Sequence, residues 1–157
     1  MKIKKLLFLA FFIPSFALSL NLDFHEYKLK NGLRVILVQR NQSKLVSTRL
    51  YYHLGGVYEK QKDLGVAHFL EHMMFKTTKN LKAGEYSYTI KSRGGYDNAG
   101  TSYDYTTYYN VLPKEEVELG LKLEAERMVN LTLNKKEFES EKKVVLEERH
   151  NRYENSP

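Results

Sequence analysis

Apolar and polar positions alternate along residues 25–39, on both sides of the dipeptide Asn31-Gly32. An Asn-Gly pair between two alternating runs is the strongest short-range signal of a β-hairpin. The segment 45–54 is rich in β-branched and aromatic residues, which favour a half-buried strand. The chain is therefore expected to begin its fold with a hairpin followed by a third strand.

The middle of the chain changes to helical patterning. Asp63 can cap a helix over 64–75, and a second, shorter helix is expected over 85–92. The segment 96–112 is dense in tyrosine and threonine, so it is expected to form two strands or one long bent strand.

Two further helices are predicted toward the C-terminus. Pro113 is expected to open the first, since proline is favoured at the first helical position. Asn134 and Glu137 have the spacing of a capping box, so the last helix should begin there and run to about Tyr153. This order of elements predicts an α+β fold with a mixed, mainly antiparallel sheet and helices packed on one face.

Residues 1–19 have the pattern of a secretory signal peptide. Three lysines precede an apolar run over 6–17, and small residues follow at Ala17 and Ser19. The run is shorter than the ~20 residues that a membrane span needs. The alternative to a signal peptide is a buried strand or an uncleaved anchor. We therefore expect a bacterial protein exported to the periplasm or beyond, with no stable membrane span after signal removal and with 20–157 as the mature chain.

Composition narrows the possible functions. The 157-residue chain has no cysteine, so any metal has to be held by nitrogen or oxygen ligands. Its formal charge of +6 falls to +3 without the three lysines of the N-terminal segment. No stripe of lysine and arginine is present, so nucleic-acid binding is not expected. A cysteine nucleophile is excluded, and no G-x-S-x-G motif supports a serine nucleophile.

The segment 64–75 carries the strongest chemical signal. A helix there would be apolar on almost all sides and therefore buried, so its histidines and glutamate would need partners. His68 and His72 lie four residues apart, about 40° from each other around a helix, and Glu71 is on the same side. This H-x-x-E-H arrangement is the inverted form of the zincin motif, in which two histidines hold zinc and a glutamate takes a proton from water. The alternative is a pair of core histidines bonded to the backbone.

The last predicted helix offers a third ligand, which catalytic zinc usually requires. At about 100° per residue, Glu141 and Glu148 share a face with apolar side chains, whereas Glu147 lies well off that face. The pattern predicts Glu148 as the buried carboxylate, with Glu141 two turns earlier and Glu147 in solvent. The alternative for Glu148 is an exposed acidic helix face.

These motifs together resemble the pitrilysin and mitochondrial-processing-peptidase family of zinc proteases. The motif His68-Phe69-Leu70-Glu71-His72 is followed by Glu148, 76 residues after His72, and this pattern resembles that of the family. The resemblance covers about residues 25–154 through the segments NGLRVILV, GGVYEKQKDLGVAHFLEHMMFKTT, GGYDNAGTSYDYTTYY and SEKKVVLEE. It implies one zinc ion bound by His68, His72 and Glu148, with Glu71 as general base and Glu141 as a supporting acid.

The resemblance also implies how a substrate would bind. In the family, the strand that matches DNAGTS pairs with the substrate backbone, which makes Asn98 and Ala99 candidate substrate contacts. An exposed edge strand can bind an extended peptide through main-chain hydrogen bonds. Ordinary sheet packing is the alternative for each of these side chains.

We therefore expect a zinc-dependent endopeptidase that acts on peptides or small proteins. Family members consist of paired homologous domains, and this chain is expected to stop partway through the first. Residues 20–157 would then be the N-terminal, incomplete part of a metallopeptidase domain. A missing C-terminal half or a homologous second subunit would complete it. The alternative is a non-catalytic or truncated zinc-binding subunit that needs a homologous partner chain for activity.

Overall fold

The computed structural model describes residues 23–153. The chain forms two compact units, Met1–Asn41 and Gln42–Pro157. The expected signal peptide lies outside the described residues. Within the described part, no helix is long and apolar enough to cross a bilayer.

The first unit contains the predicted hairpin. Strand β1 (Phe24–Lys28) pairs antiparallel with β2 (Arg34–Val38). In the connecting loop, Asn31 Oδ1 accepts a hydrogen bond of 3.1 Å from the Leu33 amide, and Gly32 has a φ of +89°. The asparagine and the glycine therefore close the turn as the sequence predicts, because glycine adopts a positive φ without steric cost.

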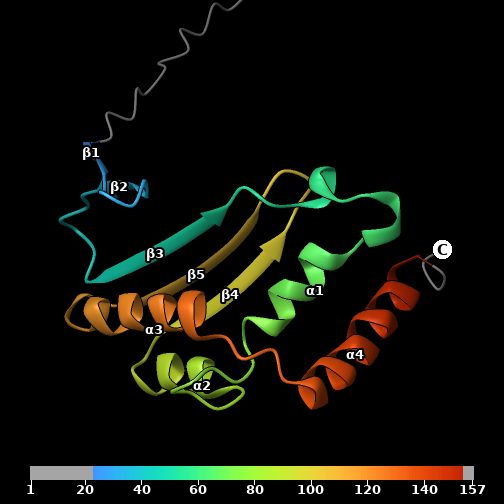
Figure 1. Ribbon diagram of the computed structural model, residues 1–157. Coiled ribbons are helices and arrows are strands. Elements are labelled where there is room, and N and C mark those ends of the chain that lie inside the picture. Colours follow the sequence, from blue (N-terminus) through green and yellow to red (C-terminus); the bar gives the residue numbers. More distant parts are fainter. Residues whose placement is uncertain (1–22, 154–157) are drawn as a thin grey trace, which may run out of the picture. The chain divides into compact units, whose positions relative to one another are not determined.

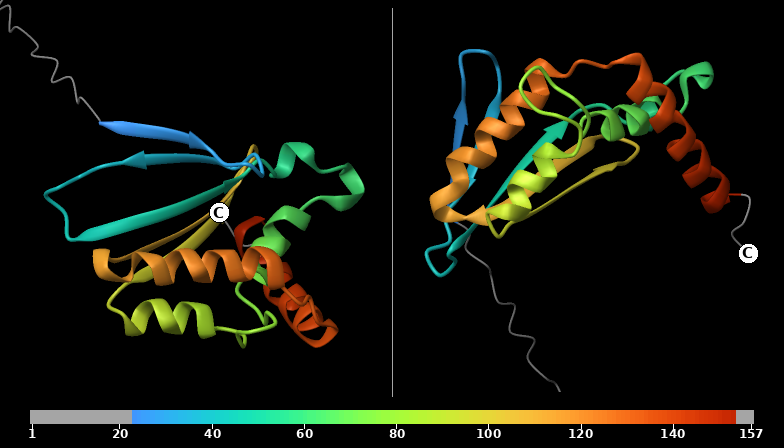
Figure 2. Two further views of the ribbon diagram at one scale, coloured as in Figure 1. Left: turned by 60° about the vertical axis from the view of Figure 1, so that its left-hand side comes forward. Right: turned by 90° about the horizontal axis from the view of Figure 1, so that it is seen from below.

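The second unit is built on a three-stranded sheet of order β3-β5-β4, in which both pairings are antiparallel. Its main elements are β3 (Leu45–Tyr52), α1 (Val66–Met73), α2 (Glu85–Ser92), β4 (Tyr96–Thr101), β5 (Thr106–Pro113), α3 (Val117–Asn130) and α4 (Lys135–Tyr153). Helices α1, α2 and α3 pack on one face of this sheet (Figures 1 and 2). The α+β fold with antiparallel sheets and helices on one face is thus confirmed.

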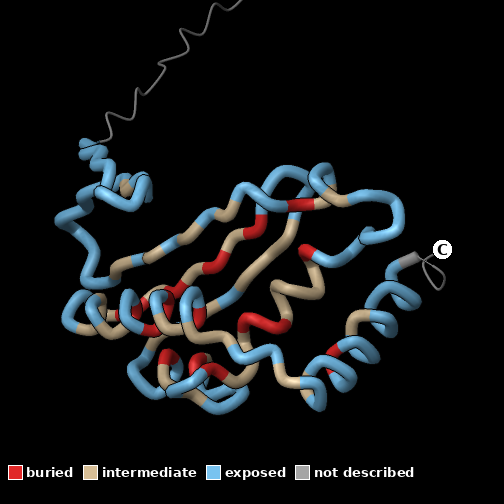
Figure 3. Tube along the Cα trace, viewed as in Figure 1, coloured by how far each residue is buried: buried red, intermediate tan, exposed pale blue. Residues whose placement is uncertain are grey.

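The burial pattern of the central strand β5 shows that the helices cover one face of the three-stranded sheet. Its residues alternate between buried and half-buried, as the period of a strand with one covered face demands. Leu112, on the buried face, packs with Ile90 of α2 and Leu123 of α3 in the main hydrophobic cluster. Figure 3 shows the buried positions concentrated on β5 and on the helix faces turned toward it.

A buried ion pair lies within this core. Arg127 and Glu124, one turn apart on α3, are 1% and 3% exposed, and Arg127 Nη2 lies 2.5 Å from Glu124 Oε1. The same carboxylate accepts hydrogen bonds from Tyr86 Oη (2.5 Å) and Asn110 Nδ2 (3.1 Å). Burial is the largest influence on the pKa of Tyr86 and raises it, so the phenol remains a donor. The guanidinium also makes cation–π contacts with three aromatic rings, those of Phe75, Tyr86 and Tyr108.

The helix ends follow local signals to different degrees. Asn134 caps α4 as predicted, since its Oδ1 accepts a hydrogen bond of 2.9 Å from the Glu137 amide while Glu137 accepts one from Asn134 Nδ2. Pro113 directly precedes the next helical segment, as predicted, but that segment begins as a 3₁₀ helix. Pro113 is the last residue of β5, and the short 3₁₀ helix η3 (Lys114–Glu116) leads from it into α3.

Replacement of the buried cation should be costly. The substitution Arg127→Met leaves the Glu124 carboxylate buried without its charge partner, so we expect a loss of about 3–5 kcal/mol in the free energy of unfolding. Urea denaturation measures this loss. The matched control is Lys122→Met, which removes an exposed α3 lysine paired with Glu118 at 2.8 Å and should change stability little. Equal effects of the two variants would contradict the importance of the buried pair.

Candidate metal centre

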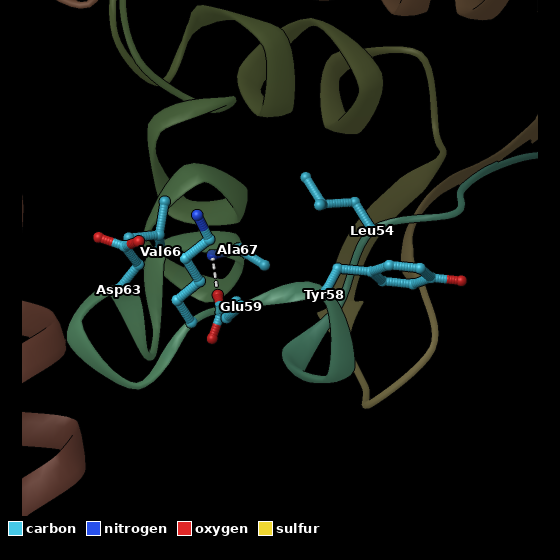
Figure 4. Close-up of a pocket in the computed structure, with 7 residues that line it drawn as sticks. Leu54, Tyr58, Glu59, Asp63, Val66 and Ala67 are labelled. Atoms are coloured by element: carbon cyan, nitrogen blue, oxygen red, sulfur yellow. Dashed lines mark hydrogen bonds between the residues drawn. The ribbon is translucent and has the colours of Figure 1, made fainter.

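Helix α1 is fixed at its N-terminus by a carboxylate from the preceding loop. Glu59 accepts hydrogen bonds from the amides of Gly65 (2.7 Å) and Ala67 (2.6 Å), as Figure 4 shows for Ala67. Gly65 precedes the helix with a φ of +92°. The predicted cap by Asp63 is wrong, because this residue ends the 3₁₀ helix η2 (Gln61–Asp63) and Glu59 satisfies the free amides.

The α1 segment is less buried than its composition predicts. The expected all-round burial of 64–75 is wrong at its start, where Leu64 is 66% and Val66 is 56% exposed. Ala67 and Met73 are the buried residues of the helix. One side of α1 packs on β4 and β5 and another on α4, so its histidine side is covered by α4 without being sealed.

Three donor atoms converge between α1 and α4. His68 Nε2 and His72 Nε2 are 3.2 Å apart, and Glu148 Oε2 lies 3.6 Å from the first and 3.5 Å from the second. Ligands bound at about 2.0–2.1 Å by a tetrahedral zinc ion are separated by about 3.3 Å. The separations and the two-nitrogen, one-oxygen donor set therefore both fit zinc.

His72 is held in a defined orientation by a second carboxylate. Its Nδ1 lies 3.0 Å from Glu141 Oε1, and Lys76 Nζ lies 2.5 Å from the other oxygen of Glu141. Burial opposes ionisation of Glu141, but the hydrogen bonds from Lys76 and His72 outweigh it and hold the pKa of this carboxyl below its usual value. An ionised Glu141 keeps the proton of His72 on Nδ1, which leaves Nε2 free to bind a metal.

The helical pattern of α4 predicted directions correctly and burial incorrectly. Glu141 and Glu148 both face α1, and Glu147 is exposed, as expected. However, Glu141 is the buried carboxylate, at 8% exposure, whereas the side chain of Glu148 is 44% exposed. The reason is that, among the described elements, α4 packs mainly on α1, so the helix face that carries Glu148 stays partly open to solvent beside the histidines.

Glu71 faces the sheet next to the donor cluster. Its Oε2 accepts a hydrogen bond of 2.6 Å from the hydroxyl of Thr101, at the end of β4. A pocket of about 270 Å³ lies at this junction and is lined by Glu71, His72, Phe75, Lys76, Asn98, Ala99 and Glu141. The structure thus brings the predicted general base and the two predicted substrate contacts together with one of the histidines.

Asn98 and Ala99 lie in the middle of β4, the edge strand next to the helix. Asn98 pairs with Tyr109 of β5 and Ala99 with Tyr108, and within the described part of the second unit no strand pairs with the other edge of β4. That edge can accept a further strand. Asn98 Oδ1 also accepts a hydrogen bond of 2.9 Å from the Ala99 amide.

Three residues of the site were not found from the sequence: Glu59, Lys76 and Thr101. Lys76 follows His72 by four residues but lies beyond Met73, the last residue of α1, so helical spacing does not place it. Glu59 and Thr101 act across loop and sheet contacts that have no fixed sequence spacing.

Two histidines and a glutamate in the order H-x-x-E-H on one helix, with a carboxylate from a second helix, define the inverted zincin class of metallopeptidase sites. The comparison with known families gives the particular group. Residues 34–157 match the family described as Insulinase (Peptidase family M16), and the chain belongs to this family.

Individual relatives agree with this assignment. The chain is 43% identical over 130 residues to the zinc protease PqqE of Helicobacter pylori, which covers 82% of this chain and 29% of that protein. The crystal structure of a protease from Helicobacter pylori superimposes with a TM-score of 0.84 and 40% identity over 87% of this chain and 33% of the other. The first half of the periplasmic protease PqqL from Escherichia coli gives a TM-score of 0.75 and 33% identity, over 83% of this chain and 30% of the other.

The chain thus spans about a third or less of the length of these relatives. It is a member of a zinc metalloprotease family, and its fold matches the N-terminal part of the solved structures. The resemblance to this family that its motifs indicate is confirmed.

The two neighbouring glutamates of α4 provide a matched test of the metal centre. Glu148→Ala removes one of the three converging donors and should weaken zinc binding more than ~100-fold, because even residues that only support a ligand contribute 10–100-fold. Glu147→Ala removes the same side chain one position earlier, away from the histidines, and should leave affinity within about twofold. Competition with a chromophoric chelator measures both values, and equal effects would contradict ligation by Glu148.

The support of His72 can be tested separately. Glu141→Ala removes the acceptor at His72 Nδ1, so the imidazole loses its fixed tautomer and orientation. Zinc affinity should fall by about 10–100-fold, less than for a lost ligand. The same competition assay applies, and an unchanged affinity would show that His72 is oriented by other contacts.

Proposed function

We propose that this chain carries the catalytic zinc centre of an endopeptidase that hydrolyses peptide bonds with metal-activated water. The observation that supports it most is the convergence of His68, His72 and Glu148, whose donor atoms lie within 4.8 Å of one another. A further carboxylate, Glu71, precedes one of these histidines and stands at the pocket beside them. Membership of a zinc metalloprotease family agrees with this geometry.

The residues have distinct roles in this proposal. His68, His72 and Glu148 would hold one zinc ion, and that ion would supply Lewis-acid activation of water and of the peptide carbonyl. Glu71 accepts the proton of the attacking water and returns it to the departing amine, as a general base and then a general acid. Glu141 keeps His72 in the tautomer that the metal needs.

A peptide or small protein substrate would bind along β4. The edge of this strand that faces away from β5 presents main-chain groups at Asn98 and Ala99, next to Glu71 in the pocket. A substrate strand added there would place its backbone across the end of the donor cluster, with main-chain hydrogen bonds supplying affinity.

A second candidate function is a non-catalytic or truncated zinc-binding subunit that needs a homologous partner chain. It is supported by a relative whose name describes one subunit of an enzyme, the mitochondrial-processing peptidase subunit beta of Rattus norvegicus, which is 35% identical over 120 residues. In this case residues 20–157 are the N-terminal part of a peptidase domain, and the remaining parts of the substrate site come from another polypeptide segment. Export to the periplasm is proposed for either function, from the N-terminal pattern and from the periplasmic protease PqqL among the relatives.

Peptide hydrolysis by the purified, zinc-loaded chain distinguishes the two functions. We expect cleavage of an unstructured peptide that a chelator abolishes and added zinc restores. Glu71→Gln should reduce the rate at least ~100-fold, since it removes the proton acceptor, while zinc affinity stays within about twofold. Mass spectrometry of the products and the chelator competition assay provide the two measurements.

The outcomes separate cleanly. A Glu71→Gln variant that still cleaves would contradict the assignment of the base. Zinc binding by the wild type without cleavage would favour the subunit that requires a partner. Absence of zinc binding would overturn both candidate functions.

A further inference from the structure

The hydroxyl of Thr101 connects the proposed general base to the sheet. Thr101 Oγ1 donates to Glu71 Oε2 at 2.6 Å, and the two residues belong to different elements, β4 and α1. Both side chains are partly buried. A hydrogen bond to a carboxylate is about twice as strong as a neutral one, so this contact is the strongest candidate for fixing the Glu71 side chain.

The hydrogen bond donated by the neighbouring Thr106 hydroxyl shows which group accepts the proton of Thr101. Thr106 Oγ1 donates to the Leu54 carbonyl at 2.8 Å, so its only proton is used. The Thr101 proton can then go to Thr106 Oγ1, at 3.2 Å, or to the carboxylate of Glu71, at 2.6 Å. The carboxylate is the nearer acceptor and is charged, so the Thr101 proton goes to Glu71, and no hydrogen bond then joins the two threonine hydroxyls.

We propose that Thr101 is a positioning residue that holds Glu71 by Oε2 and thereby leaves Oε1 as the oxygen that takes the proton from water. The inference rests on the proposed function of Glu71. Thr101 lies on the same strand as Asn98 and Ala99, so the base is tied to the strand that would bind the substrate. The distance between the base and the scissile bond is then set by β4 as well as by α1.

The chain offers a matched control in Thr107. It follows Thr106 on β5 and points to the other face of the sheet, since side chains alternate along a strand. Its Oγ1 is buried, and among the described residues it has no hydrogen-bond partner. Thr107→Val therefore makes the same chemical change as Thr101→Val in the same sheet without touching Glu71.

The contact itself is tested by a double-mutant cycle on the zinc-loaded 157-residue chain. Thr101→Val should lower the melting temperature by about 3–6 °C in the wild type, because the carboxylate loses its donor. In a Glu71→Ala background the same substitution should have little effect, whereas Thr107→Val should behave alike in both backgrounds. Additive effects of Thr101→Val and Glu71→Ala would overturn the proposal.

The positioning role is tested by kinetics. Thr101→Val should lower kcat by about 10–100-fold with KM and zinc affinity within about twofold, because the base is misplaced while the metal and the substrate strand remain. Thr101→Ser restores the hydroxyl and should recover most of kcat, and Thr107→Val should match the wild type. An unchanged kcat for Thr101→Val, or a loss that serine does not rescue, would overturn the role.

If the wild-type chain binds zinc but does not cleave peptide, the positioning of Glu71 is tested with acetohydroxamate. This ligand chelates zinc and can donate a hydrogen bond to the Glu71 carboxylate. Thr101→Val should then weaken acetohydroxamate binding about 10-fold, with recovery in Thr101→Ser and no change in Thr107→Val. Equal binding by all four proteins would overturn the inference. Failure of the wild type to bind zinc would instead overturn the proposed function, so the two failures are distinguishable.

Discussion

The candidate metal centre depends on one contact between two helices that are far apart in the sequence. His72 on α1 and Glu141 on α4 are 69 residues apart, and their side chains meet at 3.0 Å in a mostly buried position. This contact orients the imidazole and, together with the ring contact between Phe69 and Phe138, turns one face of α4 toward α1. Glu148 lies seven residues, or about two turns, farther along the same face, so its carboxylate arrives beside the histidines.

Helix α1 is positioned by contacts from several neighbouring segments. Glu59 holds its first turn, Thr101 holds Glu71 from the sheet, and Glu137 at the start of α4 accepts hydrogen bonds from Thr77 just after the helix. Glu126 of α3 binds the next residues of the same loop, and the hydrogen bonds from Thr78 and Asn80 lower its pKa to about 2. Each contact uses a carboxylate, which gives the site short, charge-assisted bonds in place of a large apolar core.

Features with local causes could be predicted from the sequence, and features with distant causes could not. The Asn-Gly hairpin, the bounds of α2 at 85–92 and the Asn134 cap of α4 all follow from neighbouring residues, and the structure shows each of them. Sequence proximity favours Asp63 as the cap of α1, although Glu59 accepts the hydrogen bond from the Ala67 amide. Helical periodicity gave the correct face of α4 but not its exposure, which depends on how many other elements pack there.

The position of Glu148 on α4 has a thermodynamic consequence. Among the described residues of α4, Glu141 alone is buried, and the residues beyond it have mainly α1 and its histidines to dock against. Zinc would bind only when α4 is packed against α1, because only then are all three donors together. Zinc binding would therefore stabilise the packing of α4 on α1. The concentration of free zinc around the protein would then determine how stably the C-terminal half of α4 packs on α1. A low zinc concentration would favour local detachment of this half of the helix.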